Sequence, residues 1–426
     1  LRRSRGLGDV YKRQKLDLAW IDSLNDGQRE IFLDALNSYL LFKKDSMDKC
    51  DLLIEQYPSF NAPKLLKIIL ILLARDNKKL QDAKILFNQI NVEDLNDHFK
   101  KYLIVISSWL KKDLHSVILN LQTIIANHQK DILAIRLLHF NSIFIGIDSN
   151  FLSKHREILG NWSNKDPLFN LILGMTSFAY EENDQLSLAQ NLADESLSLS
   201  KKDLWSWHAL LHVQDNELSS NLDSNQFFTS IDWSQYGAIK RHIWWHQALM
   251  HFYKKDFFKC LEMFDNFIFS KDEFYLDFCN TSSLLLRLHY QGVDVEQRMI
   301  KLKPIAKYFC DQQLIPFIDY HLVFFYKYFD DSDHLNIIHE GINKSYKNTP
   351  FQQTTNKYLE PVIKNLQKGE VIDTKVVHNA FHQLGGSFAQ REIILLGLLN
   401  YNKQSDLHNT IKNIFGTKKT SEVNYA

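Results

Sequence analysis

The sequence predicts an all-α fold in which helical hairpins stack into a right-handed α-solenoid. Three observations lead to this prediction. The 426-residue chain is 45% hydrophobic and 13% aromatic, which is enough for a large buried core. It contains 14 glycines and 7 prolines, fewer than the turns of a many-stranded sheet would need. From Leu16 onward, apolar residues recur at intervals of three and four, the spacing of one face of an α-helix.

The apolar spacing places helices along almost the whole chain. In the N-terminal part, we expect helices at residues 27–42, 47–56, 63–75, 80–89, 96–111, 114–127, 131–145 and 150–160. In the middle, helices 166–180 and 184–200 flank the polar turn Glu181-Glu182-Asn183, and a short helix near 223–231 precedes a loop at 232–237. Farther on, we expect helices at 274–290, 294–309, 314–329, 333–347, 351–367, 374–382, 387–400 and 406–415.

A repeat period is clearest in the middle of the chain. Leu173 and Trp207 are 34 residues apart, which is the tetratricopeptide period. In such repeats a hairpin cannot bury its apolar face alone and must stack on its neighbours. Trp207 and Trp244 are predicted to take the large-residue position of the first helix in successive repeats. The small and aromatic positions of the following second helix are assigned to Cys260, Phe264 and Phe267.

The domain organisation follows from this continuous pattern. Since no linker rich in Gly, Pro or Ser interrupts it, residues 15–415 are expected to form a single tetratricopeptide-like helical superhelix. Residues 1–14 (LRRSRGLGDVYKRQ) show no helical periodicity and resemble a translated sequencing-adapter scar, so we treat them as non-native or disordered. Residues 416–426 are polar and are expected to be a flexible tail.

Charge and cysteine content indicate where the protein works. The 50 basic and 50 acidic residues leave no surplus that would attract nucleic acid or an anionic membrane, so we expect neither as a partner. The longest apolar run, at residues 65–74, is shorter than the ~20 residues of a membrane span. Widely separated cysteines are typical of packed thiols in a reducing compartment, so we expect a cytoplasmic protein. These cysteines are Cys50, Cys260, Cys279 and Cys310.

Histidine is the unusual feature of the composition, with 17 copies. Three pairs are spaced four residues apart, which places both rings of a pair on one helix face: His208 with His212, His242 with His246, and His378 with His382. Each pair could chelate a metal or share a proton, but a third ligand is missing and no H-E-x-x-H pattern occurs. We therefore expect no metal and no cofactor. The simpler interpretation is that these rings pack against Trp205, Trp207, Trp244 and Trp245.

Two further segments carry polar groups. Asp319 and His321 are two positions apart, so on a regular helix they point about 200° from each other and should face different neighbours. In residues 385–391 (GGSFAQR), glycines end one helix, Ser387 begins the next, and Gln390 completes a capping box. The N–H groups of this helix start, together with Arg391, would also suit an anion.

No nucleophile elbow, phosphate-binding loop or kinase-like motif occurs in the sequence. The sequence therefore favours a protein that is not an enzyme, without excluding an enzyme.

Several segments, in the same order along the chain, resemble the tetratricopeptide repeat protein 38 family. They are 134–139 (AIRLLH), Gly174-Met175, Glu181-Glu182, 205–213 (WSWHALLHV), Asp232-Trp233, 245–249 (WHQAL), 282–288 (SSLLLRL), 292–295 (GVDV), Asp319 with His321, and 385–391. The resemblance covers roughly residues 24–399. Two positions depart from it: Phe388 replaces the usual histidine of the glycine-serine motif, and Asn183 stands where a turn glycine is expected.

The resemblance implies a repeat fold but no reaction. Polar residues at signature positions of a family suggest either a buried network or a ligand-binding hollow, so we treat the matching residues as candidate ligand-binding groups. They are His139, His208, His212, His246, Asp319, His321, Ser387, Gln390 and Arg391.

Two functions follow as expectations. The first is a scaffold of this family's type that binds a protein or peptide partner in the concave groove of the solenoid. The alternative is an enzyme or small-molecule binder, with a polar cluster of His, Asp and Arg in the solenoid hollow. The alternative is favoured if one cavity, within hydrogen-bonding reach of a common point, is lined by His139, His208, His246, His321 and Arg391. Dispersal of these residues among tryptophans favours the scaffold.

Overall fold

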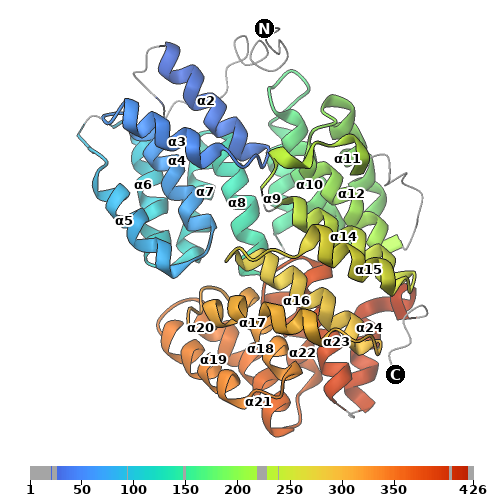
Figure 1. Cartoon of the computed structure of the whole chain (residues 1–426). Helices are drawn as coiled ribbons and strands as arrows, with labels where there is room; N and C mark the ends of the chain where they lie inside the picture. Colours follow the sequence, from blue (N-terminus) through green and yellow to red (C-terminus); the bar gives the residue numbers. More distant parts are fainter. Residues whose placement is uncertain are drawn as a thin grey trace. The chain divides into compact units, whose positions relative to one another are not determined.

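The fold is described from a computed structural model of the chain. The structure describes residue 21 and residues 26–93, 95–146, 150–217, 228–237, 239–402 and 405–420, without the side chains of 26, 216–217 and 415–420. Every element in these ranges is helical and none is a strand, which confirms the all-α prediction (Figure 1). The predicted scar at 1–14, most of the predicted helix near 223–231 and tail residues 421–426 lie outside the described residues.

The chain divides into two compact units. Unit 1 contains the described residues within 1–73, 79–142 and 149–213, and unit 2 those within 74–78, 143–148 and 214–426. The last residues of α8 and α12 belong to unit 2. In the ranges that the structure describes, no helix is both long and apolar enough to cross a membrane.

Unit 1 is built from helices that pack against their neighbours in the sequence. Contacts join α2 to α3, α4 to α5, α6 to α7 and α10 to α11 (Figure 1). The helices of this unit are α2 (Asp26–Leu40), α3 (Ser46–Gln56), α4 (Asn61–Leu73), α5 (Leu80–Asn88), α6 (Asp97–Leu110), α7 (Leu114–Asn127), α8 (Ile132–Ile145), α9 (Phe151–Gly160), α10 (Phe169–Glu181), α11 (Leu186–Leu199) and α12 (Leu204–Glu217), and a short 3-10 turn, η1 (Asn77–Lys79), lies between α4 and α5 in the sequence.

A recurrent turn joins helices within hairpins. A residue with positive φ is followed by an aspartate that caps the next helix: Lys112 then Asp113, Lys255 then Asp256, and Asp330 then Asp331. The Asp113 N–H donates to Ser108 O at 3.0 Å, which closes a Schellman-type turn. The Asp113 side chain then accepts from the Ser116 N–H at 3.1 Å. Because lysine or aspartate takes the left-handed position, these hairpins need few glycines.

Gly174 allows α10 and α12 to approach each other closely. A Cβ atom at this position would lie 2.4 Å from Ser206 Oγ, which is far inside van der Waals contact. The neighbouring residues Leu173 and Trp207 are the two positions of the predicted 34-residue period.

Unit 2 also contains contacts between helices that are far apart in the sequence. Helix α23 packs on α16 and α18, and α22 packs on α23 and α24 (Figure 1). A stack in which each hairpin touches only its neighbours would not bring α23 to α16. The helices of this unit are α14 (Ile239–Tyr253), α15 (Phe257–Met263), α16 (Tyr275–Tyr290), α17 (Glu296–Cys310), α18 (Pro316–Tyr328), α19 (Ser332–Ser345), α20 (Phe351–Thr354), α21 (Glu360–Lys368), α22 (Thr374–Gln383), α23 (Phe388–Tyr401) and α24 (Ser405–Thr420), preceded by a 3-10 turn, η2 (Trp233–Gln235).

Two π-helical segments interrupt unit 2 where regular helix was expected. Segment η3 (Phe264–Ile268) follows α15, and η4 (Thr355–Leu359) separates α20 from α21 within the predicted helix 351–367. Pro361 stands in the first turn of α21 and has no N–H to donate to the preceding turn. The wider π turn lies directly before this proline.

The tryptophan register differs from the prediction. Trp205 and Trp245 are buried, at 5% and 0% exposed, whereas the predicted core positions Trp207 and Trp244 are half-buried. Trp244 stacks on Phe267, itself 42% exposed, with ring centroids 4.2 Å apart. Aromatic neighbours one or two positions apart point to different sides of a helix, and apolar spacing alone did not reveal which one faces the core.

Trp245→Ala is expected to lower the free energy of unfolding by about 3 to 5 kcal/mol, because it removes a fully buried indole. Trp244→Ala, at the adjacent half-buried position, is the matched control and should cost less than about 2 kcal/mol. Urea denaturation followed by circular dichroism measures both losses. A larger loss for Trp244→Ala would contradict the observed register.

Candidate functional site

Unit 2 contains a chain of hydrogen bonds between side chains of different helices. At one end, the backbone N–H of Ser387 donates to Gln390 Oε1 at 3.0 Å, within the predicted capping box of α23. Gln390 Nε2 donates to Asn280 Oδ1 on α16 at 3.4 Å. Asn280 Nδ2 lies 3.0 Å from His242 Nδ1 on α14. Two amides therefore link the start of α23 to a histidine of α14.

The chain continues through a second histidine to a carboxylate. His242 Nε2 lies 3.3 Å from His246 Nε2, one turn later on α14. His246 Nδ1 lies 3.0 Å from Asp215 Oδ2, near the end of α12. We name this group the histidine relay; its members are Ser387, Gln390, Asn280, His242, His246 and Asp215.

The two ends of the relay fix the direction of each bond in it. A backbone N–H can only donate and a carboxylate can only accept. Starting from Ser387, each amide accepts on oxygen and donates from nitrogen, so His242 accepts at Nδ1 and carries its proton on Nε2. That proton is donated to His246, which carries its own proton on Nδ1 and donates it to Asp215. The network thus assigns both rings as neutral, in opposite tautomers.

The relay is buried and rests on an aromatic ring. All six members are at most 5% exposed. The Trp245 indole stacks on His242, with centroids 5.4 Å apart and planes 16° apart, and meets His246 edge-on at 4.8 Å. Buried polar groups are costly unless they are bonded, and a connected network holds its members rigidly. The predicted packing of histidines on tryptophan is therefore present here together with a polar network.

A buried ion pair ties together the helices that carry the relay. Arg287 of α16 donates to Glu392 Oε2 of α23 at 3.2 Å and to the Ala389 carbonyl at 2.5 Å. The Tyr253 hydroxyl of α14 donates to the same carboxylate at 2.7 Å. Arg287 and Glu392 are 0% and 1% exposed. These bonds fix α14, α16 and α23 relative to one another within two turns of Asn280 and Gln390.

Arg391 forms its contacts with residues close to it in the sequence. Its guanidinium donates to the Gly386 carbonyl and lies over the Phe381 ring, 5.1 Å from the centroid. The Gly386 N–H donates to Ile143 O at 2.9 Å, and the Ser387 N–H is taken by Gln390. The N–H groups of Gly386 and Ser387 and one guanidinium nitrogen of Arg391 are thus used within the protein, which favours the helix-capping role over anion binding.

Asp319 and His321 face different partners on α18, as the sequence predicts. Asp319 Oδ2 accepts from the Tyr346 hydroxyl at 2.5 Å, and His321 Nδ1 donates to Phe317 O of its own helix at 2.8 Å. Both side chains are fully buried. Burial raises the pKa of Asp319 to about 7 against the opposing effect of the Tyr346 bond, and burial lowers the pKa of His321 to about 3. His321 is therefore neutral, and Asp319 is protonated below pH 7.

The candidates of unit 1 lie in an aromatic core. His139 Nδ1 is 2.8 Å from His155 Nε2, and His155 Nδ1 donates to Phe151 O at 2.8 Å. Trp205 meets His139 edge-on, with centroids 5.2 Å apart, and its ring lies 4.4 Å from that of His208. Burial lowers the pKa of His139 far below its ordinary range and that of His155 to about 4. Both rings of the His139 pair are consequently neutral near pH 7.

His212 stands between a histidine and a carboxylate in unit 1. Its Nε2 is 3.1 Å from His208 Nε2, and its Nδ1 is 3.2 Å from Glu181 Oε2. His208, His212 and Glu181 are 1%, 1% and 3% exposed. With Glu182, this group contains enough nitrogen and oxygen donors to hold a metal ion.

The structure brings some candidate residues together and supplies partners that sequence analysis missed. In unit 2, His246, Gln390 and Ser387 belong to one relay; in unit 1, His208 and His212 form a pair. The missed partners are Asp215, Asn280, Glu181 and His155. None of these four carried a signal of its own in the sequence; Asn280, for example, stands next to the polar residues Thr281 and Ser282 in the predicted helix 274–290.

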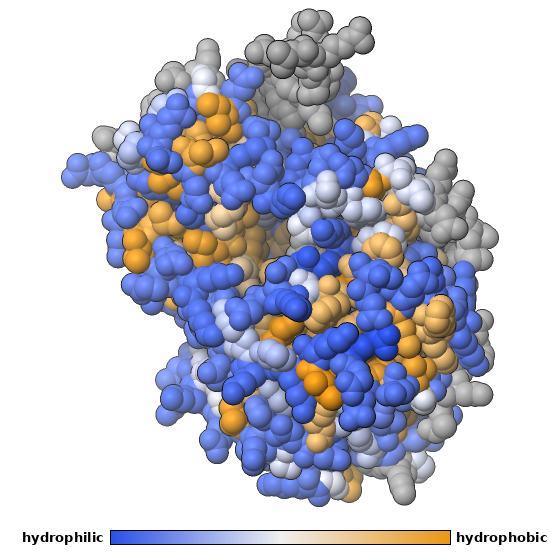
Figure 2. Space-filling view, in the orientation of Figure 1, coloured by the Kyte–Doolittle hydropathy of each residue, from blue (hydrophilic) through white to orange (hydrophobic). Residues whose placement is uncertain are grey.

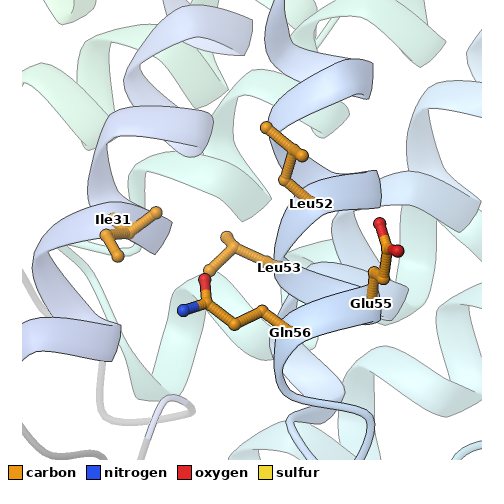
Figure 3. Close-up of a pocket in the computed structure, with 5 residues that line it drawn as sticks. All are labelled: Ile31, Leu52, Leu53, Glu55 and Gln56. Atoms are coloured by element: carbon orange, nitrogen blue, oxygen red, sulfur yellow. The ribbon is translucent and has the colours of Figure 1, made fainter.

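The surface of unit 1 carries an apolar hollow. Figure 2 shows orange patches over the region that α2 to α5 occupy in Figure 1. A hollow of about 460 Å³ lies between α2 and α3, and in Figure 3 Leu53 and Gln56 of α3 point toward Ile31 of α2. Ile31 and Leu52, which line it, are 43% and 64% exposed.

Comparison with known proteins gives no further assignment. No model of a known protein family matches the chain. No solved structure matches it either. The function is therefore inferred from the geometry of these groups.

Asp319→Asn is expected to remove a pH dependence of stability. A carboxyl whose folded-state pKa is raised to about 7 binds its proton more tightly in the folded than in the unfolded chain. Its contribution to stability is fully present below the unfolded pKa of about 4 and is lost as the pH rises through 7. Asparagine can still accept from the Tyr346 hydroxyl but carries no charge.

Between pH 5 and pH 8, the wild type should therefore lose about 2 to 3 kcal/mol more unfolding free energy than Asp319→Asn loses. Urea denaturation at each pH measures this difference. Parallel stability curves for the two proteins would show that the Asp319 pKa is not raised.

Proposed function

We propose that this protein is an enzyme or small-molecule binder, in which stacked helical hairpins hold the histidine relay of unit 2 as the working site. One observation carries the proposal: the relay is a continuous, directed chain of bonds that ends on a buried carboxylate. Three of the candidate residues, His246, Gln390 and Ser387, belong to it. Of the five residues whose convergence on one cavity would favour this function, His246 alone is a member of the relay.

The relay is suited to accept a proton. A general base is often a histidine that donates one ring N–H to a carboxylate and accepts a proton at its other ring nitrogen. A proton that reaches His242 Nδ1, in place of the Asn280 amide, would make that ring cationic. The Nε2 proton of His242 would then pass to His246, whose cationic ring lies beside the Asp215 carboxylate. We therefore assign His242 Nδ1, which the Asn280 amide holds in this structure, as the nitrogen that would accept a proton from a substrate.

The proposal also includes the arrangement of the helical hairpins, the protein family and the cellular location. We include a right-handed α-solenoid of tetratricopeptide-like hairpins, which the neighbour packing in unit 1 and the contact at Gly174 support. The motifs quoted from the sequence support membership of the tetratricopeptide repeat protein 38 family. A cytoplasmic location is supported by four buried free cysteines.

His246→Gln is expected to weaken ligand binding, because it breaks the relay between His242 and Asp215. Small molecules that copurify with the wild type are identified by mass spectrometry, and their affinity is measured by calorimetry. His251→Gln is the matched control, since His251 lies on the same helix but is partly exposed and contacts Asp256.

The affinity of His246→Gln should fall about tenfold or more while that of His251→Gln stays at the wild-type value. Unchanged helical circular dichroism shows that the variant is folded. Wild-type affinity in His246→Gln would overturn the proposal, and so would a wild type that retains and binds no small molecule.

A protein or peptide partner is the second candidate function, and the hollow between α2 and α3 favours it. Leu52 is 64% exposed there, and an exposed leucine in a hollow suits an apolar side chain of a partner. Leu52→Glu should reduce recovery of a partner by affinity purification. Leu119→Glu on α7, where the side chain is 62% exposed outside the hollow, is the control and should leave recovery unchanged. Equal recovery of the partner with both variants would show that the hollow is not its binding site.

A further inference from the structure

A second polar cluster lies in unit 1, at the C-terminal end of α10, and shares no residue with the relay. Glu181 is the last residue of α10 and Glu182 is its C-cap. Together with His212 of α12, each offers one ligand atom, and the three atoms lie within 4.8 Å of one another. Glu181 and His212 are buried, and Glu182 is half-buried. We infer that this cluster binds a divalent transition-metal ion, such as Zn²⁺ or Mn²⁺.

Electrostatics at this position call for a cation. The C-terminal end of a helix carries a partial negative charge, so two consecutive carboxylates there are repelled by the helix and by each other. Burial of Glu181 adds to the cost of its charge. The contact of Glu181 Oε2 with His212 Nδ1, at 3.2 Å, offsets this charge fully only if the ring is protonated. A divalent ion bound between these side chains supplies positive charge beside both carboxylates.

The ring nitrogen of His212 that would not bind the ion is already hydrogen-bonded, as it usually is in a metal-bound histidine. His212 Nε2 lies 3.1 Å from His208 Nε2. When Nδ1 binds the ion, the ring carries its proton on Nε2 and donates it to His208. Metal-ligating histidines usually make such an outer hydrogen bond, which fixes the tautomer and the ring orientation. The His208 ring is in turn held by Phe178, which stacks on it with centroids 5.6 Å apart, and by Trp205.

Close packing of α10 on α12 brings the ligands together. Glu181 follows Gly174 by about two helical turns, and His212 follows Ser206 by nearly the same distance. The close approach at Gly174 and Ser206 therefore carries His212 alongside the end of α10. Carboxylates that are distant from the His208–His212 pair in the sequence become its neighbours. The expectation of no metal rested on a missing third ligand, which Glu181 and Glu182 provide.

The donor set selects the kind of ion. Mg²⁺ and Ca²⁺ prefer oxygen ligands alone, whereas one imidazole with two carboxylates suits Zn²⁺, Mn²⁺ or Fe²⁺. Ligands about 2.1 Å from a tetrahedral ion are about 3.4 Å apart, close to the 3.2 Å between Glu181 Oε2 and His212 Nδ1. Glu182 is half-buried at the end of its helix, so its side chain can close onto the ion. Three protein ligands leave a position for water or a substrate.

Titration of the chelator-stripped full chain with Co²⁺, followed by visible absorption and by competition with Zn²⁺, tests the inference. The wild type should bind stoichiometrically with submillimolar affinity. Glu182→Gln and His212→Gln should each weaken binding about tenfold or more. Glu195→Gln on the exposed side of α11 is the matched control and should bind as the wild type does.

Glu182→Gln keeps the test decisive, because this half-buried position can be changed without removing a core residue. Its circular dichroism should equal that of the wild type. Wild-type affinity in a folded Glu182→Gln variant would overturn the inference, as would a wild type that binds neither Co²⁺ nor Zn²⁺. Because Glu182 is not a member of the relay, the Glu182→Gln variant tests this cluster with every relay residue unchanged.

Discussion

The structure of unit 2 depends on the requirement that polar groups buried between α14, α16 and α23 be hydrogen-bonded. Arg287 is fully buried and meets this requirement by donating to Glu392, to the first turn of α23 and to Ser283 O of its own helix. A shift of α23 by one residue would break the bonds that Arg287 makes to α23 and would also take Gln390 away from Asn280. Polar bonding therefore sets the register of helices whose apolar surfaces alone would allow several alignments.

The two units use histidine differently. In unit 2, amide groups and a carboxylate select the tautomers of His242 and His246, so a directed chain of hydrogen bonds runs through both rings. In unit 1, His212 faces carboxylates at the negative end of a helix, an environment that favours a cation. The same spacing of four residues thus has a different chemical meaning in each unit, and what surrounds the pair decides which one applies.

Local features were predictable from the sequence, and long-range partners were not. Helix α7 begins and ends at the predicted residues because Asp113 caps it and its apolar spacing is regular. The pair His242 and His246 was visible because its spacing lies within one helix. Asp215 and Asn280 were missed because they come from other helices, and a single polar residue does not reveal its partner. Trp205 and Trp207 differ in burial, but both satisfy the same local pattern.

The return of α23 to α16 has a consequence for synthesis of the chain on the ribosome. Hairpins such as α6 and α7 contain all the residues of their shared interface and can form soon after they emerge. Helix α16 must instead wait for more than a hundred further residues before α23 covers it. During that interval its apolar side and the Arg287 guanidinium are exposed to the solvent, so nascent unit 2 is the part of the protein most in need of a chaperone.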